Sequence, residues 1–341
     1  MAPVFWFEIT DWKNEIVLVS DILIENDIYF SSESMKTIPV RSSLNSLRYF
    51  DTKADLDLNK IKTKFNILLK KINFINYNAF KLFSDYKKSF YYKVNEIVAS
   101  RSVISRIMNT PFEINLNRRK WIIKAELFGN ENSIFLYYDQ DEEKKLSEEM
   151  AKQYEMLKRY LFAKFPISYH RKVTSAYNEM FASFIEAKLG SHEICYTTEI
   201  PGIVSNTEIT SIEQLNTVEP IYCDIFEDGE YSEDLINYNP IWWSKAALLN
   251  AKQCIIASYD KNNDCIKNIY KFNIDKFEDK TKYENLWSPD AAWNFLNDFL
   301  QFVKDSVKSV SSDVKGNCMW KFQSFPDDEP TVSCEILALI I

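Results

Sequence analysis

Hydrophobic residues recur every three or four positions along a segment in the middle of the chain. Within residues 142–165 the apolar positions are Leu146, Met150, Tyr154, Leu157, Leu161 and Phe165. Glu, Lys and Gln fill many of the positions between them, as on the solvent-facing side of an amphipathic helix. The pattern predicts a helix over 142–165 that ends at Pro166, because proline lacks a backbone donor and crowds the preceding turn.

A second helix is predicted to begin after Ser288. Serine is a favoured N-cap, and Pro289 suits the first helical position, where a backbone N–H is not needed. The apolar positions that follow are Trp293, Leu296, Leu300, Val303, Val307 and Val310. Phe295, Phe299 and Phe302 add a second apolar face, so we expect this helix to be buried on two sides.

Shorter runs rich in β-branched and aromatic residues predict strands at 121–127, 133–138, 255–257 and 331–333, with further extended segments in 1–50. Residues 57–105 instead carry Lys, Phe, Leu and Ile at helical spacings. Strands and helices are mixed without a regular β-α-β repeat, and no low-complexity linker divides the sequence. The pattern predicts an α+β fold, with mixed β-sheets flanked by helices, in a single domain over 1–341.

The composition excludes several common kinds of site. The chain has five glycines, and the closest pair, Gly190 and Gly202, is twelve positions apart. Dinucleotide and P-loop sites need closely spaced glycines so that backbone N–H groups can approach phosphates, and both are therefore excluded. The six cysteines show no C-x-x-C spacing, and only two histidines are present, so a zinc site is not indicated. We expect reduced and mostly buried thiols.

The charge balance is acidic, with a net charge of −8 from 41 Lys and Arg against 49 Asp and Glu. General nucleic-acid binders usually carry a basic excess, because they neutralise phosphates. Any contact with RNA must therefore come from a local patch. No apolar run approaches the roughly 18 residues of a membrane helix, and the first residues lack the basic segment of a signal peptide. We expect no association with membranes.

Several short strings follow one another in an order that is similar to a known family. They are 46–50 (SLRYF), 107–113 (IMNTPFE) followed by Trp121, 164–165 (KF), 242–243 (WW) with 248–249 and 255–257, then Phe272, 287–289 (WSP) and 294–296 (NFL). Together they resemble the Rai/DXO family of RNA 5′-end decapping nucleases over most of the chain. The resemblance implies a single Rai/DXO-like domain. In active members it also implies hydrolysis by two Mg²⁺ or Mn²⁺ ions, which carboxylates hold.

Four positions depart from the family's active-site motifs. The Glu that ends G-Y-K-F-E falls on Pro166, and the Asp of E-x-D falls on Pro201. The Lys of E-hydrophobic-K has become Phe226, and the Gln of the W-W helix has become Lys245. Neither proline can bind a metal ion through its side chain, and phenylalanine offers no charge to a phosphate. The resemblance therefore implies that these are degenerate catalytic positions.

Three residues of the motifs remain as the remnant of a pocket. The family's upstream arginine matches Arg101, the Glu of E-x-D matches Glu199, and Asp224 stands at the acid of E-hydrophobic-K. Two carboxylates cannot neutralise or coordinate two divalent cations, and we expect Lys245 to add repulsion. The resemblance with these losses predicts a pseudo-enzyme that is not catalytic and holds no metal cofactor.

The segment after this pocket is unusually acidic. Within 227–234 the acids are Glu227, Asp228, Glu230, Glu233 and Asp234. Their charge would repel phosphate, and they form a possible surface for a protein partner. A solvated loop is the simpler interpretation of the same pattern.

The chain most resembles one member of the family with degraded catalytic motifs, a nuclear protein of the insect germline. That resemblance implies a nuclear, non-catalytic factor in piRNA-cluster transcription, which associates with Deadlock and Rhino and suppresses 5′-end processing, termination and splicing. An RNA 5′ end is a further implied ligand. The alternative is an active metal-dependent decapping enzyme or 5′–3′ exoribonuclease, and an unrelated interaction domain is a third interpretation. In the active alternative other acids complete the site: Glu186, Glu193, Glu219 and Asp228.

Simpler roles stay open for individual residues. Arg101 can equally be a structural arginine, and Glu199 with Asp224 can equally bind one Mg²⁺ weakly. His192 is typical of a turn or packing residue, and the pair Trp242–Trp243 is typical of core packing.

Overall fold

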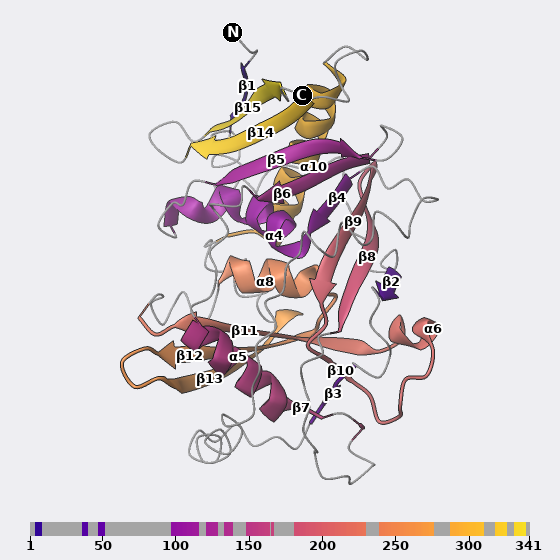
Figure 1. Ribbon diagram of the computed structural model, residues 1–341, viewed down its shortest axis with the longest axis vertical. Coiled ribbons are helices and arrows are strands. Elements are labelled where there is room, and N and C mark those ends of the chain that lie inside the picture. Colours follow the sequence, from indigo (N-terminus) through magenta and orange to yellow (C-terminus); the bar gives the residue numbers. More distant parts are fainter. Residues whose placement is uncertain are drawn as a thin grey trace, which may run out of the picture.

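The computed structural model describes residues 4–8, 36–39, 47–51, 97–115, 121–128, 133–138, 148–163, 165–166, 181–229, 239–275, 287–309, 318–325 and 331–338. These residues form two β-sheets, with helices between the sheets and outside one of them (Figure 1). The α+β architecture with mixed sheets is the one that the sequence predicts. Among these residues, no helix is both long enough and apolar enough to cross a membrane.

The larger sheet has nine strands in the order β1-β15-β14-β5-β6-β4-β9-β8-β2. The strands are β1 (Val4–Glu8), β2 (Lys36–Pro39), β4 (Ile97–Ser100), β5 (Ile122–Phe128), β6 (Ser133–Tyr138), β8 (Ala182–Leu189), β9 (His192–Glu199), β14 (Cys318–Phe325) and β15 (Thr331–Ala338). Most neighbours are antiparallel, but β4 is parallel to both β6 and β9. The register places Ser100, the last residue of β4, opposite Thr197 of β9. The end of β4 therefore lies close to the end of β9.

The smaller sheet has six strands in the order β13-β12-β11-β10-β3-β7. The strands are β3 (Tyr49–Phe50), β7 (Phe162–Ala163), β10 (Gly202–Val204), β11 (Glu219–Glu227), β12 (Gln253–Asp260) and β13 (Cys265–Asn273). Strand β10 pairs with β11 only from Glu219 to Ile221. Beyond Ile221, β11 continues beside β12 but no longer has β10 on its other side.

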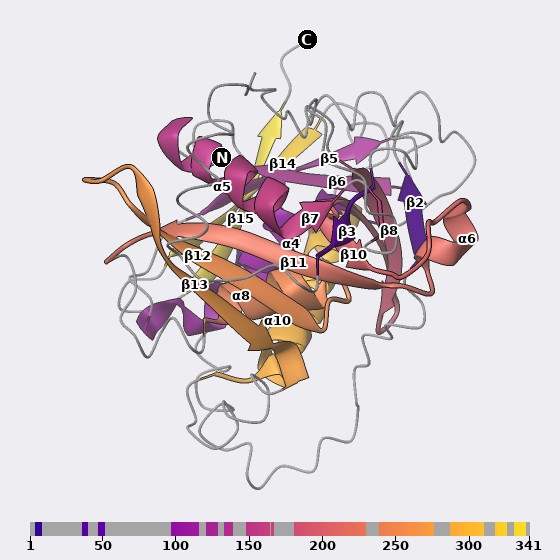
Figure 2. The same ribbon diagram turned by 90° about the horizontal axis from the view of Figure 1, so that it is seen from below.

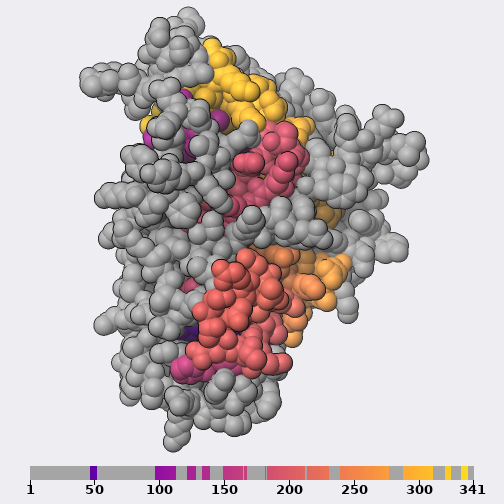
Figure 3. All heavy atoms as spheres, turned by 90° about the vertical axis from the view of Figure 1, so that its right-hand side faces the viewer, coloured from indigo at the N-terminus to yellow at the C-terminus, as the bar shows by residue number. Residues whose placement is uncertain are grey.

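Helices lie on both sides of the six-stranded sheet (Figures 1 and 2). Between the sheets lie α4 (Arg101–Asn109), its 3-10 continuation η4 (Thr110–Asn115), α8 (Pro240–Ala247) and α10 (Pro289–Lys308). On the outer face lies α5 (Glu148–Leu161), which contacts β11 and β12. The short α6 (Ile212–Leu215) lies beside β2. In the space-filling view of Figure 3, the residues that follow β9 form a continuous patch below those of β8 and β9.

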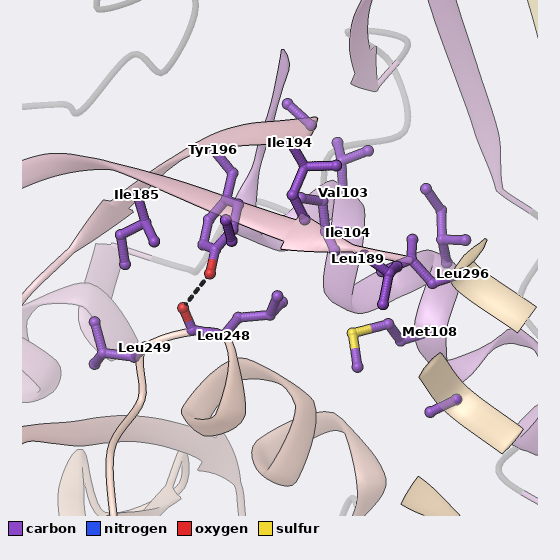
Figure 4. Packing of buried hydrophobic residues seen from close by; sticks show 14 of the residues in the cluster. Val103, Ile104, Met108, Ile185, Leu189, Ile194, Tyr196, Leu248, Leu249 and Leu296 are labelled. Carbon is purple, nitrogen blue, oxygen red and sulfur yellow. Dashed lines mark hydrogen bonds between the residues drawn. The ribbon is translucent and has the colours of Figure 1, made fainter. Parts of the chain in front are cut away.

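The main core fills the space between the two sheets. Its members come from both sheets and from α4, α8 and α10. Figure 4 shows side chains of α4, β8 and β9 pointing toward the residues that follow α8. The hydroxyl of Tyr196 on β9 donates to the backbone oxygen of Leu248, 2.6 Å away, which ties the larger sheet to the end of α8. A second core lies between α5 and the outer face of the six-stranded sheet.

The second predicted helix is confirmed as α10. It begins at Pro289, and the Ser288 hydroxyl accepts a hydrogen bond from the backbone N–H of Ala291 at 3.3 Å. Phe295, Phe299 and Leu300 are all buried, as expected for a helix packed on two sides. Val310 lies outside the described residues. The strand predicted at 133–138 matches β6, and the one at 121–127 is shifted by one residue in β5.

Two predictions need correction. The helix predicted over 142–165 ends at Leu161, because the next two residues leave it to pair with Tyr49 and Phe50 as strand β7. Pro166 therefore does not end it. Residues 97–100, predicted as part of a helical segment over 57–105, form strand β4. Residues 52–96 and 142–147 lie outside the described residues.

Candidate functional site

Arg101 is the first residue of α4, directly after β4. The Ser100 side chain caps the helix by accepting from the backbone N–H of Val103 at 3.3 Å. The guanidinium of Arg101 lies over the ring of Tyr222 on β11, with 5.2 Å between its carbon and the ring centroid. Its Nη1 atom is buried and has no hydrogen-bond partner among the residues that the structure describes. Arg101 is thus held against the six-stranded sheet by stacking on an aromatic ring.

Asp224 lies in the part of β11 that extends past β10. Its Oδ2 accepts a hydrogen bond from the ammonium of Lys245 on α8 at 2.8 Å and another from the hydroxyl of Tyr222. Its Oδ1 accepts from the backbone N–H of Ile225 at 2.9 Å. Burial raises the pKa of this carboxyl, but the ion pair with Lys245 and the hydrogen bonds outweigh that effect and lower the pKa. Asp224 is therefore ionised at neutral pH and bound to a lysine.

Glu199 is the last residue of β9 and pairs with a lysine from α5. The ammonium of Lys158 lies 2.7 Å from Oε1 of Glu199 and 2.5 Å from Oε1 of Glu155. It also lies 4.6 Å from the ring centroid of Tyr154. The side chains of Lys158 and Glu199 are only 13% and 18% exposed. Burial lowers the pKa of Lys158, but the two carboxylates outweigh this and raise it.

Tyr154 lies next to both ion pairs. Its hydroxyl donates to the backbone oxygen of Cys223 at 3.2 Å, beside Asp224. Burial is the main cause that raises the pKa of Tyr154 well above its ordinary value. The carboxylates of Glu199 and Asp224 raise it further, whereas the Arg101 guanidinium lowers it. Tyr154 thus lies beside the Lys158–Glu199 pair and beside the strand position of Asp224. Arg101 stacks on Tyr222, whose hydroxyl donates to Asp224, so contacts link the three remnant residues into one region.

Comparison with known families decides what kind of domain this is. Residues 28–337 match the family described as RAI1 like PD-(D/E)XK nuclease. The chain belongs to this family. Comparison with curated proteins found no match.

Solved structures of the family share the fold. S. pombe Rai1 in complex with 3′-FADP is 12% identical, with a TM-score of 0.66 over 99% of this chain and 100% of that chain. Candida albicans Rai1 in complex with pU5 and Mn²⁺ is 14% identical, with a TM-score of 0.62 over 92% and 93%. K. lactis Dxo1 in complex with manganese is 11% identical, with a TM-score of 0.57 over 99% of each chain. At these identities the likeness concerns the fold.

Three of the four positions that depart from the family motifs are buried, and the fourth, Lys245, is partly exposed. Phe226 lies two residues along β11 from Asp224 and packs against Trp242 of α8, with ring centroids 5.3 Å apart. Pro201 follows β9 and is buried, and so is Pro166. None of these three side chains brings an oxygen to Glu199 or Asp224. At the position of the motif lysine, the Phe226 ring packs against other aromatic side chains.

The remaining donors do not fit a pair of divalent cations. Within the described residues, no group of three or more His, Cys, Asp or Glu side chains is arranged to hold a metal ion. The acids of the active alternative all lie within these residues and do not complete such a group: Glu186, Glu193, Glu219 and Asp228. A pair of such cations carries four positive charges, which two carboxylates cannot neutralise.

The acidic segment is described only at its beginning. Glu227 lies 3.9 Å from the ammonium of Lys261, and Asp228 lies 2.6 Å from that of Lys267, both on the β12–β13 hairpin. Glu230, Glu233 and Asp234 lie outside the described residues. The first two acids therefore have local partners on the neighbouring hairpin.

Packing roles were predicted for His192 and for the pair Trp242–Trp243, and all three side chains are buried in the structure. His192 begins β9 and is buried, with its Nδ1 atom 3.4 Å from the ammonium of Lys304. Trp242 and Trp243 are both buried, and the Trp243 ring contacts those of Trp287 and Trp293. Of the five cysteines whose burial is described, four are buried, as predicted.

Sequence reasoning missed Lys158, Glu155 and Tyr222. Tyr154 was assigned only to the apolar face of a helix, and Lys158 looked like one of its many solvated lysines. The spacing of Glu155 and Lys158 indicates an intrahelical ion pair, but nothing in the sequence indicates that Lys158 reaches Glu199 across 41 residues. Only the contact between α5 and the end of β9 shows that it belongs to the site.

Proposed function

We propose that this chain is a non-catalytic member of its family, a pseudo-nuclease that acts by binding rather than by hydrolysis. One observation carries the proposal. The two carboxylates that remain at the motif positions, Glu199 and Asp224, are each bound to a lysine, and within the described residues no group of three or more His, Cys, Asp or Glu side chains could hold a metal ion. Hydrolysis at a phosphate by two metal ions requires both ions to be held in place by such acids.

The loss of the motif lysine supports the same proposal. In this family mechanism a positive side chain beside the metal-binding acid would stabilise charge that develops on the phosphate. Phe226 stands there, buried against Trp242 and Tyr270, and offers neither a proton nor a charge. This position therefore lacks the charge that the motif lysine would bring to the transition state of phosphate hydrolysis.

For the biological setting, the pattern of degenerate positions resembles Cutoff, a nuclear protein of the insect germline. On that resemblance we propose a nuclear factor in piRNA-cluster transcription, with Deadlock and Rhino as protein partners. It would suppress 5′-end processing, termination and splicing. Arg101, whose buried Nη1 atom has no hydrogen-bond partner within the described part of the chain, is the residue that would contact an RNA 5′ end. The acidic segment that begins at Glu227 is the proposed partner surface.

A hydrolysis assay tests the catalytic part of the proposal. The purified chain is incubated with RNA bearing a 5′-triphosphate, a 5′-monophosphate or a cap, in Mg²⁺ or Mn²⁺, beside an active family member. We expect no product above the rate without protein. Metal-dependent product that disappears in the double variant Glu199→Ala, Asp224→Ala would contradict the proposal and support the active alternative.

A separate experiment tests the proposed role in piRNA-cluster transcription. The tagged chain is recovered from germline nuclei, and its associated proteins are identified. Recovery of Deadlock or Rhino supports the proposed role, whereas a chain that brings down no chromatin or transcription protein contradicts it.

A further inference from the structure

The two ion pairs of the site are built from four different elements. Glu199 ends β9 and Asp224 lies within β11, while Lys158 belongs to α5 and Lys245 to α8. The two helices lie on opposite faces of the six-stranded sheet. The two ammonium groups therefore come from helices on opposite faces of this sheet, and no local helical spacing accounts for either pair.

Each ammonium takes the place that a bound cation needs. Divalent metal ions lie about 2.0–2.6 Å from the carboxylate oxygens that bind them. The Lys158 and Lys245 nitrogens lie 2.7 Å and 2.8 Å from Oε1 of Glu199 and Oδ2 of Asp224. A metal ion at the same oxygens would stand against a positive charge, in a region where the side chains are at most about one-third exposed. Metal and lysine exclude each other there.

The charges of the site also balance without a metal ion. The positive side chains are Arg101, Lys158 and Lys245, and the negative ones are Glu155, Glu199 and Asp224. A half-buried cluster of three carboxylates would need cations to offset its charge. Here three basic side chains of the protein itself supply the positive charge.

We infer that Lys158 and Lys245 are resident cations of this site, which hold the carboxylates in the way that divalent ions would. The inference goes beyond the proposed lack of catalysis, since a pocket could lose hydrolysis and still bind a metal ion. It means that the pocket is complete without Mg²⁺ or Mn²⁺. It also means that removal of the lysines, rather than of a metal, uncovers the carboxylates.

Binding of Mn²⁺ to the full chain, followed by electron paramagnetic resonance, tests this inference. The wild type is compared with the double variant Lys158→Met, Lys245→Met, and the melting temperature of each is measured with and without Mn²⁺. The control is Lys261→Met, Lys267→Met, which removes two lysines from the more exposed ion pairs of the β12–β13 hairpin. It changes the total charge by the same amount.

We expect no specific Mn²⁺ binding by the wild type or the control. The site variant is expected to melt lower by about 4 °C or more, because two carboxylates lose their partners. Mn²⁺ should then bind it about tenfold or more tightly than the wild type and restore part of the lost melting temperature. If the double variant does not fold, the single variant Lys245→Met and the wild type give the same comparison.

Two results would overturn the inference. One is specific Mn²⁺ binding by the wild type that is lost in Glu199→Gln, Asp224→Asn. The other is a folded site variant that gains no affinity for Mn²⁺. Either result leaves the proposed function standing if RNA is not hydrolysed, whereas metal-dependent hydrolysis refutes the proposed function directly.

Discussion

The ring of Phe226 packs against that of Trp242, with 5.3 Å between the centroids, two residues along β11 from the carboxylate of Asp224. Side chains two residues apart on a strand point to the same face. The position that carries a lysine in the family motif is therefore part of the core between β11 and α8. The phenylalanine is now part of the packed core, so restoring the lysine alone would not restore a catalytic site.

Phe226→Lys is expected to destabilise the protein by about 3 kcal/mol, because it removes aromatic packing and buries a charge. Phe226→Leu keeps an apolar side chain and should cost only about 1 kcal/mol. Urea unfolding of both variants measures the difference. Equal costs for the two variants would show that the position tolerates a charge and is not part of the core.

Gly202 opens β10, close to Glu199, and packs directly on Phe162. A Cβ atom at this glycine would meet Cε1 of the Phe162 ring at 2.6 Å, which is shorter than real contacts. The ring is buried and also packs against Phe50, so it has little room to move. We expect Gly202→Ala to cost about 2 kcal/mol through overpacking.

A double variant checks the cause of that cost. Phe162→Leu removes most of the ring that a Cβ atom at position 202 would meet. The free-energy cost of Gly202→Ala should therefore be smaller in the Phe162→Leu variant than in the wild type. Additive costs in thermal or urea unfolding would contradict a direct contact.

Tyr196 joins the larger sheet to the loop after α8 through its hydrogen bond to the Leu248 oxygen (Figure 4). Tyr196→Phe leaves the ring in place and removes only the hydroxyl, so the buried carbonyl of Leu248 loses that donor. The expected cost is about 1–2 kcal/mol. Tyr137→Phe, at a less buried tyrosine of the same sheet, is the comparison, and a smaller cost there is expected.

The acidic segment can be tested without disturbing the core. Glu227→Lys with Asp228→Lys reverses the charge of two residues whose ion pairs, among the described residues, are with lysines of the hairpin. We expect a similar melting temperature and weaker capture of the protein partner. Glu208→Lys, at an exposed position on another loop, should leave capture unchanged. Unaltered capture by the first variant would exclude the segment as the partner surface.

Local patterns were sufficient to predict the elements whose ends are set by their own residues. The cap and proline at 288–289 fix the start of α10, and its two apolar faces follow from spacing alone. The end of α5 could not be predicted, because Phe162 and Ala163 leave the helix to pair with β3, more than 100 residues away in sequence. Strand β4 was missed for the same reason, since its partners β6 and β9 come later in the chain.

The site was predictable only in part. Motif positions placed Arg101, Glu199 and Asp224, and the structure links these three through contacts with Tyr222, Lys158 and Tyr154. We expected Lys245 to repel cations, and the structure places its ammonium 2.8 Å from Oδ2 of Asp224. Lys158 could not be found from spacing, because its partner is set by how α5 packs against the end of β9. Ion pairs between distant elements depend on the fold and leave no local pattern.

The most direct test of the account is anomalous X-ray diffraction from crystals of the chain soaked in Mn²⁺. The account requires that no manganese peak lie at Glu199 and Asp224, and that the Lys158 and Lys245 ammonium groups remain beside those carboxylates. A manganese peak bound to both carboxylates, with the lysines displaced, would contradict it.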